Sequence, residues 1–362
     1  MKSNLIRLLT FAAILTSFTY VTIFARNLGI SDINIGILVA LYSTSIFFSS
    51  YIFGRASDRY GRRLFVSVGI LVSVIAFFLQ IFAYDYVSLL LIRILVVFCI
   101  GIFPSALVAY VYELKRNLGK FASFGSLGWC VGFIIAGIIA TYFTINGVFI
   151  LSSLLSLIAF LISLKLEPVK HKTLKIPFFP IKLIRKNLSV YLPILIRHSG
   201  AFMIWTFWPL YLQSLGADLF WVGIIQSINS FTQFIVMYTV TDRIKSIKLI
   251  KAGTILSGIT FFTFALAVNF WYILPTQVLL GLSWAFMYVG ALRYVTEKNV
   301  EKATVNGMLD SVLNLSSIIG PLLATFVISF VGDYRTTMYI ASLLAFISFF
   351  VFRVLEYSRK SI

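Results

Sequence analysis

The sequence predicts an all-α membrane protein with twelve transmembrane helices, arranged as two pseudo-symmetric six-helix bundles. Three observations lead to this prediction: the composition, the number of long apolar runs and an internal repeat. Of the 362 residues, 60% are hydrophobic and only 12% are charged, whereas a soluble chain carries about 25% charged residues. The chain has too little polar surface to face water, so we expect a lipid bilayer to surround it.

Twelve apolar runs are long enough to cross a membrane, because about 20 helical residues span the ~30 Å hydrocarbon core. Their continuity excludes transmembrane β-strands, which alternate over about 10 residues. We expect the first run to be an uncleaved helix rather than a signal peptide, since eleven further runs follow it. The predicted spans are 5–27, 33–54, 64–83, 86–110, 121–144, 147–165, 189–213, 219–240, 249–268, 271–294, 303–330 and 335–355.

Basic residues gather on one side of the predicted membrane. With the N-terminus in the cytoplasm, all but four of the 30 Lys and Arg residues lie on the cytoplasmic side; Arg26 and Arg335 lie outside, and Arg93 and Arg197 lie within spans. This is the positive-inside pattern. It explains the net charge of +18 without a nucleic-acid partner. We therefore expect a multi-pass protein of the cell membrane with both termini cytoplasmic.

A basic segment divides the chain into two similar halves. Residues 167–188, rich in Lys and Pro, are predicted to form a cytoplasmic linker between an N-terminal bundle (1–166) and a C-terminal bundle (189–362). Within this linker, residues 181–186 are predicted either to form a short interfacial turn against anionic headgroups or to be solvated.

The two halves have matching residues at nearly constant separation. The matched pairs are Gly29 and Gly216, Gly132 and Gly320, Asp58 and Asp242, and Glu113 and Glu297. Two repeats around a central cavity, with a solute site near the midplane, are a common plan of membrane transporters.

The loop after the second predicted span has the most specific motif in the chain. Residues 54–63 read Gly-Arg-Ala-Ser-Asp-Arg-Tyr-Gly-Arg-Arg. This resembles the signature loop of the major facilitator superfamily, Gly-x-x-x-Asp-Arg-x-Gly-Arg-Arg, at every specified position. The fourth span partly resembles the family pattern Arg-x-x-x-Gly-x-Gly-x-Gly: Arg93 and Gly101 are present, and Val97 and Cys99 replace two glycines.

The resemblance implies a secondary transporter that moves a small organic solute by alternating access, with proton coupling as one option. It also implies a cytoplasmic latch, in which Asp58 interacts with the positive end of a neighbouring helix and Glu113 pairs with Arg62 or Arg63. An ordinary basic loop is the alternative, but it would require neither the Asp nor the glycines. The expected latch residues are Gly54, Asp58, Arg59, Gly61, Arg62, Arg63, Glu113, Asp242 and Arg243.

Four ionisable residues lie within predicted spans, where charges are costly and usually face a partner or a cavity: Arg93, Arg197, His198 and Asp310. Asp310, roughly 10 Å deep in its span, is a candidate proton carrier; a structural ion pair or an interfacial position are the alternatives. His198 is either a titrating group or a packing residue. Arg93 is expected to bind an anionic group, to polarise a carboxylate or to pair with backbone carbonyls.

Polar and aromatic residues of several spans predict a solute cavity, which needs apolar walls and a few polar groups. Gln226, Asn229 and Gln233 are spaced three and four apart and share one helical face. Hydrogen bonding between helices is the alternative role of this stripe. The expected cavity residues are Trp205, Trp208, Gln226, Asn229, Gln233, Trp284 and Asn314.

Other function classes have little support in the sequence. The chain has only two His residues, and we find no zinc motif, nucleophile and base pair, or phosphate-binding loop. We therefore expect no enzyme activity, no metal and no cofactor. Two alternatives to coupled transport remain: a facilitative uniporter without ion coupling, and a transporter-like sensor that binds its solute without moving it. We expect a monomer whose partners are a small-molecule substrate and lipid, with protons as candidate coupling ions.

Overall fold

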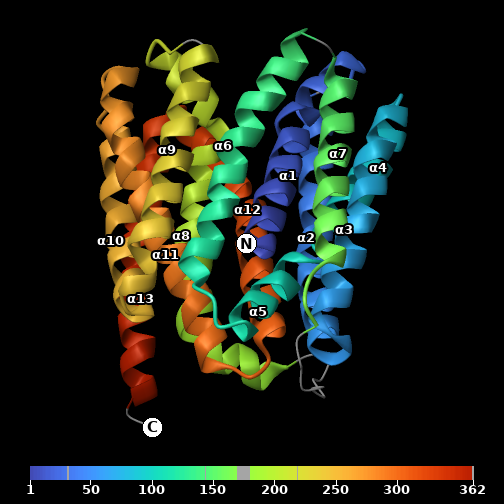
Figure 1. Cartoon of the computed structure of the whole chain (residues 1–362). Coiled ribbons are helices and arrows are strands. Elements are labelled where there is room, and N and C mark those ends of the chain that lie inside the picture. Colours follow the sequence, from blue (N-terminus) through green and yellow to red (C-terminus); the bar gives the residue numbers. More distant parts are fainter. Residues whose placement is uncertain (31, 143, 169–179, 218, 361–362) are drawn as a thin grey trace. The chain divides into compact units, whose positions relative to one another are not determined.

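The computed structural model describes residues 1–30, 32–142, 144–168, 180–217 and 219–360, and these residues form helices joined by short turns (Figure 1). The helices of the first half are α1 (Lys2–Asn27), α2 (Asp32–Tyr60), α3 (Arg62–Leu79), η1 (Gln80–Phe82), α4 (Tyr86–Ile100), α5 (Pro104–Glu113), α6 (Leu118–Tyr142) and α7 (Ile145–Leu164). Those of the second half are α8 (Ile181–Ser214), α9 (Leu219–Thr239), η2 (Thr241–Arg243), α10 (Ser246–Ala265), η3 (Phe270–Tyr272), α11 (Ile273–Lys298), α12 (Lys302–Val331) and α13 (Tyr334–Lys360).

The helices match the predicted spans. Among the described residues, nine helical segments are long and apolar enough to cross a membrane. Helices α1, α2 and α9, with 26, 29 and 21 residues, complete the predicted set of twelve. The predicted fold class is therefore confirmed.

The fourth span consists of two helices, and the sequence explains the break. Asp85 caps the start of α4 by accepting a hydrogen bond from the Ser88 backbone; hydrogen bonds from the Ser88 side chain and backbone lower the pKa of Asp85. Helix α4 ends before Gly101, and Pro104 begins α5. Because Pro has no N–H and a fixed φ, it begins a new helix more readily than it continues an old one.

The seventh span starts earlier than predicted. Helix α8 begins at Ile181, eight residues before the predicted span 189–213. The carbonyl oxygen of Pro180 accepts hydrogen bonds from the backbone N–H groups of Leu183 and Ile184, at 2.9 and 3.1 Å. These bonds hold the first turn of the helix. The expected interfacial turn at 181–186 is therefore the start of a long helix. The part of the predicted linker at 169–179 lies outside the described residues.

The turns after α1 and α8 have the same geometry. Gly29 and Gly216 have φ angles of 77° and 86°, in a region that L side chains rarely adopt. In both turns the residue after the glycine donates its N–H to a carbonyl oxygen five residues earlier, at 3.1 and 3.0 Å. This arrangement ends a helix and satisfies its last carbonyl groups. The matched glycines thus have matching structural roles in the two halves.

By packing, the chain divides into two compact units. Unit 1 comprises Met1–Ile176 with Asn299–Ser311, and unit 2 comprises Pro177–Lys298 with Val312–Ile362. In unit 1, α1 packs against α6 and α7; in unit 2, α10 packs against α11 and α13, and α13 packs against α8. Helix α12 contributes its first residues to unit 1 and the remainder to unit 2. The predicted bundles 1–166 and 189–362 would assign all of α12 to the second bundle, and that division stays a prediction.

Candidate functional site

The motif at residues 54–63 covers the end of α2 and the start of α3. Asp58 is fully buried, and its carboxylate accepts hydrogen bonds from the backbone N–H groups of Ala303 and Thr304, at 3.2 and 2.6 Å, and from the Thr304 hydroxyl. These N–H groups belong to the first turn of α12, where the backbone donors have no partner within the helix and the helix dipole is positive. Asp58 of α2 thus caps a helix that follows it by more than 240 residues.

The structure explains why glycine occupies both of these positions in the motif. A Cβ atom on Gly54 would lie 2.7 Å from the carbonyl oxygen of Ala303 and 3.1 Å from the Cα atom of Gly307. Any side chain there would push α2 away from the start of α12. Gly61 has a φ of 110°, which L side chains rarely adopt, and this residue separates α2 from α3. The two glycines therefore allow the contact that Asp58 makes.

Arg62 connects Asp58 to Glu113. Its Nη1 atom lies 2.5 Å from Oδ1 of Asp58, and its Nε and Nη2 atoms donate to Oε1 of Glu113 at 3.1 and 2.9 Å. Only 4% of Arg62 is exposed. The sequence left Arg62 and Arg63 as possible partners of Glu113, and the structure pairs Glu113 with Arg62. Arg63 instead donates to the carbonyl oxygen of Leu164 at 2.6 Å.

Arg59 is exposed, with its guanidinium 5.1 Å from the centroid of the Tyr60 ring. The buried motif residues Asp58 and Arg62 therefore form a charge network with Glu113 of α5, which we call the latch network.

The second-half counterpart is built differently. Asp242 and Arg243 lie in the short helix η2, and Arg293 of α11 holds this turn. Its Nη1 atom donates to the carbonyl oxygen atoms of Thr241 and Ile244 at 2.8 and 2.9 Å, and its Nε atom pairs with Glu297 at 3.1 Å. Sequence reasoning did not select Arg293, although its spacing of four from Glu297 on one helix is a recognisable signal.

Asp310 lies on α12, about 12 Å along the helix from its start at 1.5 Å per residue. Its Oδ2 atom accepts a hydrogen bond from the hydroxyl of Ser105, on α5, at 3.1 Å. No ion pair involves Asp310 among the residues that the structure describes.

Arg7 was missed as a site residue because the charge pattern placed it on the cytoplasmic side. In the structure it is only 3% exposed. Its guanidinium lies 3.7 Å from the centroid of the Phe11 ring and 5.2 Å from that of Phe121. Unit 1 thus holds a buried cation that hydropathy alone did not identify.

Arg93 is fully buried and joins three helices of unit 1. Its Nη1 atom donates to the Ser17 hydroxyl at 2.9 Å and to the Gln80 side-chain oxygen at 2.7 Å. Its guanidinium lies 4.5 and 5.0 Å from the ring centroids of Phe18 and Tyr42. These hydrogen-bond partners are neutral side chains, where the sequence suggested an anion or backbone carbonyls.

Arg197 and His198 lie on α8 in unit 2. The Nε atom of Arg197 donates to the Ser257 hydroxyl at 2.8 Å, and its Nη1 atom lies 3.2 Å from Nδ1 of His198. The His198 ring stacks on Trp284 with 4.9 Å between centroids, and Trp284 stacks on Tyr288 at 5.2 Å. Two of the predicted ionisable residues and one predicted cavity residue are therefore neighbours.

The other predicted cavity residues fall in separate places. Trp208 is 1% exposed and belongs to the hydrophobic core of unit 2, with Trp205 edge-on against it at 5.5 Å. Along α9, Gln233 donates to the side-chain oxygen of Asn229 at 2.9 Å. Gln226 and Asn314 are half-buried, on α9 and α12.

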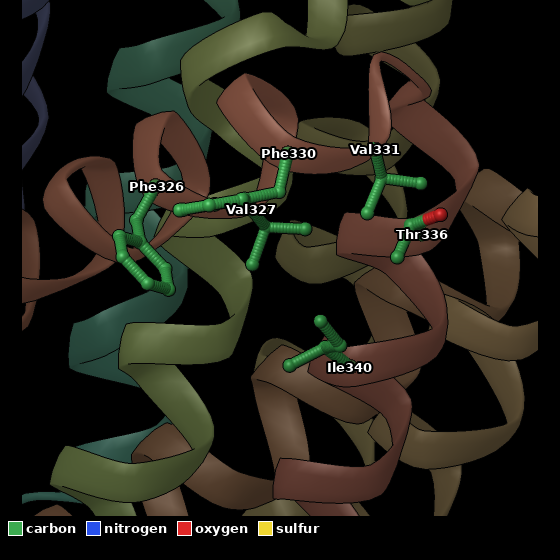
Figure 2. Close-up of a pocket in the computed structure, with 6 residues that line it drawn as sticks. All are labelled: Phe326, Val327, Phe330, Val331, Thr336 and Ile340. Atoms are coloured by element: carbon green, nitrogen blue, oxygen red, sulfur yellow. The ribbon is translucent and has the colours of Figure 1, made fainter.

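A groove of about 390 Å³ in unit 2 has none of these residues in its lining (Figure 2). Its lining comes from the end of α12 and the start of α13, and its members are apolar except for one hydroxyl: Phe326, Val327, Phe330, Val331, Thr336 and Ile340. A solute site needs several polar groups that fix the orientation of the ligand. In a bilayer, lipid chains are sufficient to fill this groove.

The latch network generates a prediction about stability. We expect Asp58→Asn to lower the free energy of unfolding by about 3 kcal/mol, because removing one partner of a buried ion pair leaves the other charge uncompensated. Thermal unfolding in detergent measures this. Asp85→Asn is the control, since Asp85 is an exposed helix cap and Asn caps a helix about as well as Asp, so this change is expected to cost less than about 0.5 kcal/mol. Equal effects of the two substitutions would contradict the buried network.

The choice of Arg62 over Arg63 can be tested separately. A double-mutant cycle of Arg62→Gln with Glu113→Gln is expected to give a coupling energy of at least about 1 kcal/mol, because the two side chains are in contact. The same cycle with Arg63→Gln is expected to give about 0.5 kcal/mol or less. Chemical unfolding in detergent measures both cycles. A larger coupling to Arg63 would show that the contacts are assigned to the wrong arginine.

Comparisons with known proteins agree with this architecture. The family model described as Major Facilitator Superfamily matches residues 5–301 and 194–361. The chain is 24% identical over 355 residues to the multidrug resistance protein MdtG of Proteus mirabilis (strain HI4320), covering 90% of this chain and 88% of that protein. The crystal structure of the human organic anion transporter MFSD10 (TETRAN) has the same fold, with a TM-score of 0.75, 17% identity and 97% of each chain covered. With a family match over most of its length, the chain belongs to the Major Facilitator Superfamily.

Proposed function

We propose that this membrane transporter is a secondary transporter that moves a small organic solute by alternating access. Family membership makes the chain a multi-pass transporter rather than an enzyme. The names of the two relatives refer to multidrug resistance and to organic anions, and both point to small organic solutes. The cap that Asp58 places on the start of α12 is the observation that carries the proposal.

This cap suits a reversible latch because it is an ionic contact that can be broken without exposing a free charge. While the Asp58 carboxylate binds the N–H groups of Ala303 and Thr304, the first turn of α12 is held against the end of α2. When that contact opens, Arg62 still pairs with the carboxylate, so that the charge keeps a partner. Opening and closing of the cap would then accompany the change of access.

Basic side chains at helix ends support a cytoplasmic location of both termini. Lys2 donates to the carbonyl oxygen of Lys165, just after α7, and Lys186 donates to that of Lys298, the last residue of α11, each at 2.8 Å. Cations are favourable at helix C-termini. These contacts place basic side chains at helix ends, and the positive-inside pattern supports their cytoplasmic location in a protein of the cell membrane. A monomer is the simplest form for such a transporter.

The latch proposal predicts a separation of binding from transport. In proteoliposomes, Asp58→Asn is expected to reduce the solute transport rate at least about tenfold, equivalent to 1.4 kcal/mol in the barrier, because the cap no longer stabilises one of the two access states. Solute affinity is expected to change much less. Asp85→Asn serves as the control. Unchanged transport by a folded Asp58→Asn protein would count against the latch.

We further propose that Asp310 carries the coupling proton. The carboxyl group lies within a membrane span and contacts the neutral hydroxyl of Ser105. A structural ion pair was the alternative prediction, and the contacts of the described residues provide no cation within ion-pair distance of Asp310. A carboxyl group hydrogen-bonded to a hydroxyl can gain or lose a proton without breaking an ion pair.

If Asp310 carries the coupling proton, its replacement should affect only the transport that a pH gradient drives. Asp310→Asn should abolish solute accumulation driven by a pH gradient and leave solute exchange at equal pH within about threefold, because the neutral amide cannot exchange a proton. Uptake into proteoliposomes with and without the gradient measures both. Glu301→Gln, just before α12, is the matched carboxylate control. Accumulation that survives in Asp310→Asn would show that another group carries the proton. Wild-type flux that does not respond to the pH gradient would leave the uniporter alternative, whereas binding without any flux would favour the sensor.

A further inference from the structure

Arg197 has hydrogen-bonding capacity that the protein does not use. The residue is 1% exposed. Its Nε atom donates to Ser257, and its Nη1 atom contacts Nδ1 of His198, which must accept because a guanidinium has no acceptor. Its buried Nη2 atom has no hydrogen-bond partner. Buried polar atoms are rarely left in this condition, so a ligand or water is expected there.

The charge of Arg197 is also unpaired within its unit. The ion pairs in the described part of unit 2 join Lys251 to Glu356 and Arg293 to Glu297. Neither pair includes Arg197, whose contacts are to neutral groups. A buried cation without a counter-ion is costly, and in a membrane span such a residue usually has a function. An anion arriving with the solute would supply the missing partner.

Unit 1 has a similar imbalance, observed independently. Arg93 is fully buried, and its Nε and Nη2 atoms have no hydrogen-bond partner. Its contacts to Ser17 and Gln80 are neutral. The interior of unit 1 thus also contains a guanidinium group that its hydrogen-bond partners do not neutralise.

Aromatic side chains form a wall beside Arg197. Its guanidinium lies 5.7 Å from the Trp284 ring centroid and 5.0 Å from that of Phe261. The rings of His198, Trp284 and Tyr288 stack in series, with interplanar angles of 24° and 10°. These three side chains are half-buried, so part of each ring surface is accessible. A flat ligand body can pack on such a surface.

Arg197 also lies at a suitable depth. The membrane-crossing part of its helix runs from Ile181 to Trp208, and Arg197 lies within three residues of the centre of this segment, or about 4 Å at 1.5 Å per residue. The hydrocarbon core is ~30 Å thick, so this position is close to the midplane. Solute sites of secondary transporters with internal repeats lie at that depth.

We propose that Arg197 is the anion-binding residue of the solute site, and that the solute is an organic anion with a carboxylate or sulfonate attached to a planar apolar body. The guanidinium binds the acidic group through charge-assisted hydrogen bonds, and the planar body packs against the aromatic side chains beside Arg197. This inference rests on the proposed transport function and assigns its substrate class.

The first test uses three probes that share a naphthyl ring and carry a negative, neutral or positive group: 2-naphthoate, 2-naphthamide and 2-naphthylmethylammonium. Affinities for the purified full-length chain in detergent are measured by thermal stabilisation. We expect naphthoate to bind at least about tenfold more tightly than naphthamide, as charge-assisted hydrogen bonds allow, and the ammonium compound to bind most weakly. Equal affinities, preference for the ammonium compound or absence of naphthoate binding would overturn the proposal.

The second test changes the residue. Arg197→Gln is expected to reduce the affinity for naphthoate to that for naphthamide, and Arg197→Lys, which keeps the charge but loses the planar fork, is expected to retain part of the preference. The control is Arg353→Gln, since Arg353 is an exposed arginine of the same unit; it should bind naphthoate as the wild type does. If Arg197→Gln fails to fold, Arg197→Lys is used, and an unchanged preference in that variant would overturn the role of the guanidinium fork.

Transport measurements separate this proposal from the proposed function. Flux of neutral or cationic solutes without a preference for anions would keep the transporter function and overturn the anion site. Naphthoate binding that depends on Arg197, with no flux of naphthoate or any other tested solute, would support the anion site and count against transport.

Discussion

Away from water, an unpaired backbone N–H group or an unpaired charge costs several kcal/mol, and most features of this protein follow from that cost. Continuous helices satisfy their own backbone within each span. The exceptions are the helix ends, where donors or acceptors remain. The chain satisfies these ends with side chains: Asp85 caps α4, Lys2 binds the carbonyl oxygen of Lys165 after α7, and Asp58 caps α12.

Asp58 differs from the other caps because it lies far from its helix in sequence. A local cap would hold the start of α12 in any conformation of the protein. A cap supplied by α2 exists only while α2 and α12 are in contact. The first turn of α12 needs a hydrogen-bond acceptor, and α2 supplies it. The cap can therefore form and break as α2 and α12 come into contact and separate, as a latch requires. Arg62 and Glu113 complete the network and keep the Asp58 charge compensated.

The buried charged groups of the spans differ in how completely neighbouring groups compensate their charge. In the latch network every charged group has an oppositely charged neighbour. Asp310 has a hydroxyl, and Arg93 and Arg197 have neutral partners with nitrogen atoms to spare. The first arrangement stabilises one structure. In the proposed mechanism, a proton compensates the charge of Asp310 and an anionic solute that of Arg197.

The composition and the apolar runs by themselves determined the fold class, because a span of about 20 apolar residues has few alternatives in lipid. The motif at 54–63 likewise indicated the family before any contact was known. Hydropathy could not locate the start of α8 at Ile181, because basic residues near the membrane surface can be helical as well as solvated. It also could not show that Arg7 is buried.

Only the tertiary structure decided which partners the functional side chains have. Arg62 and Arg63 are equivalent in sequence, but they leave α3 in different directions, so that Glu113 meets only the first. Trp208 and Trp284 were both expected at a cavity, yet one lies in the core and the other stacks on His198. Such contacts join residues far apart in the chain, and their geometry depends on how whole helices pack, which local sequence patterns do not encode.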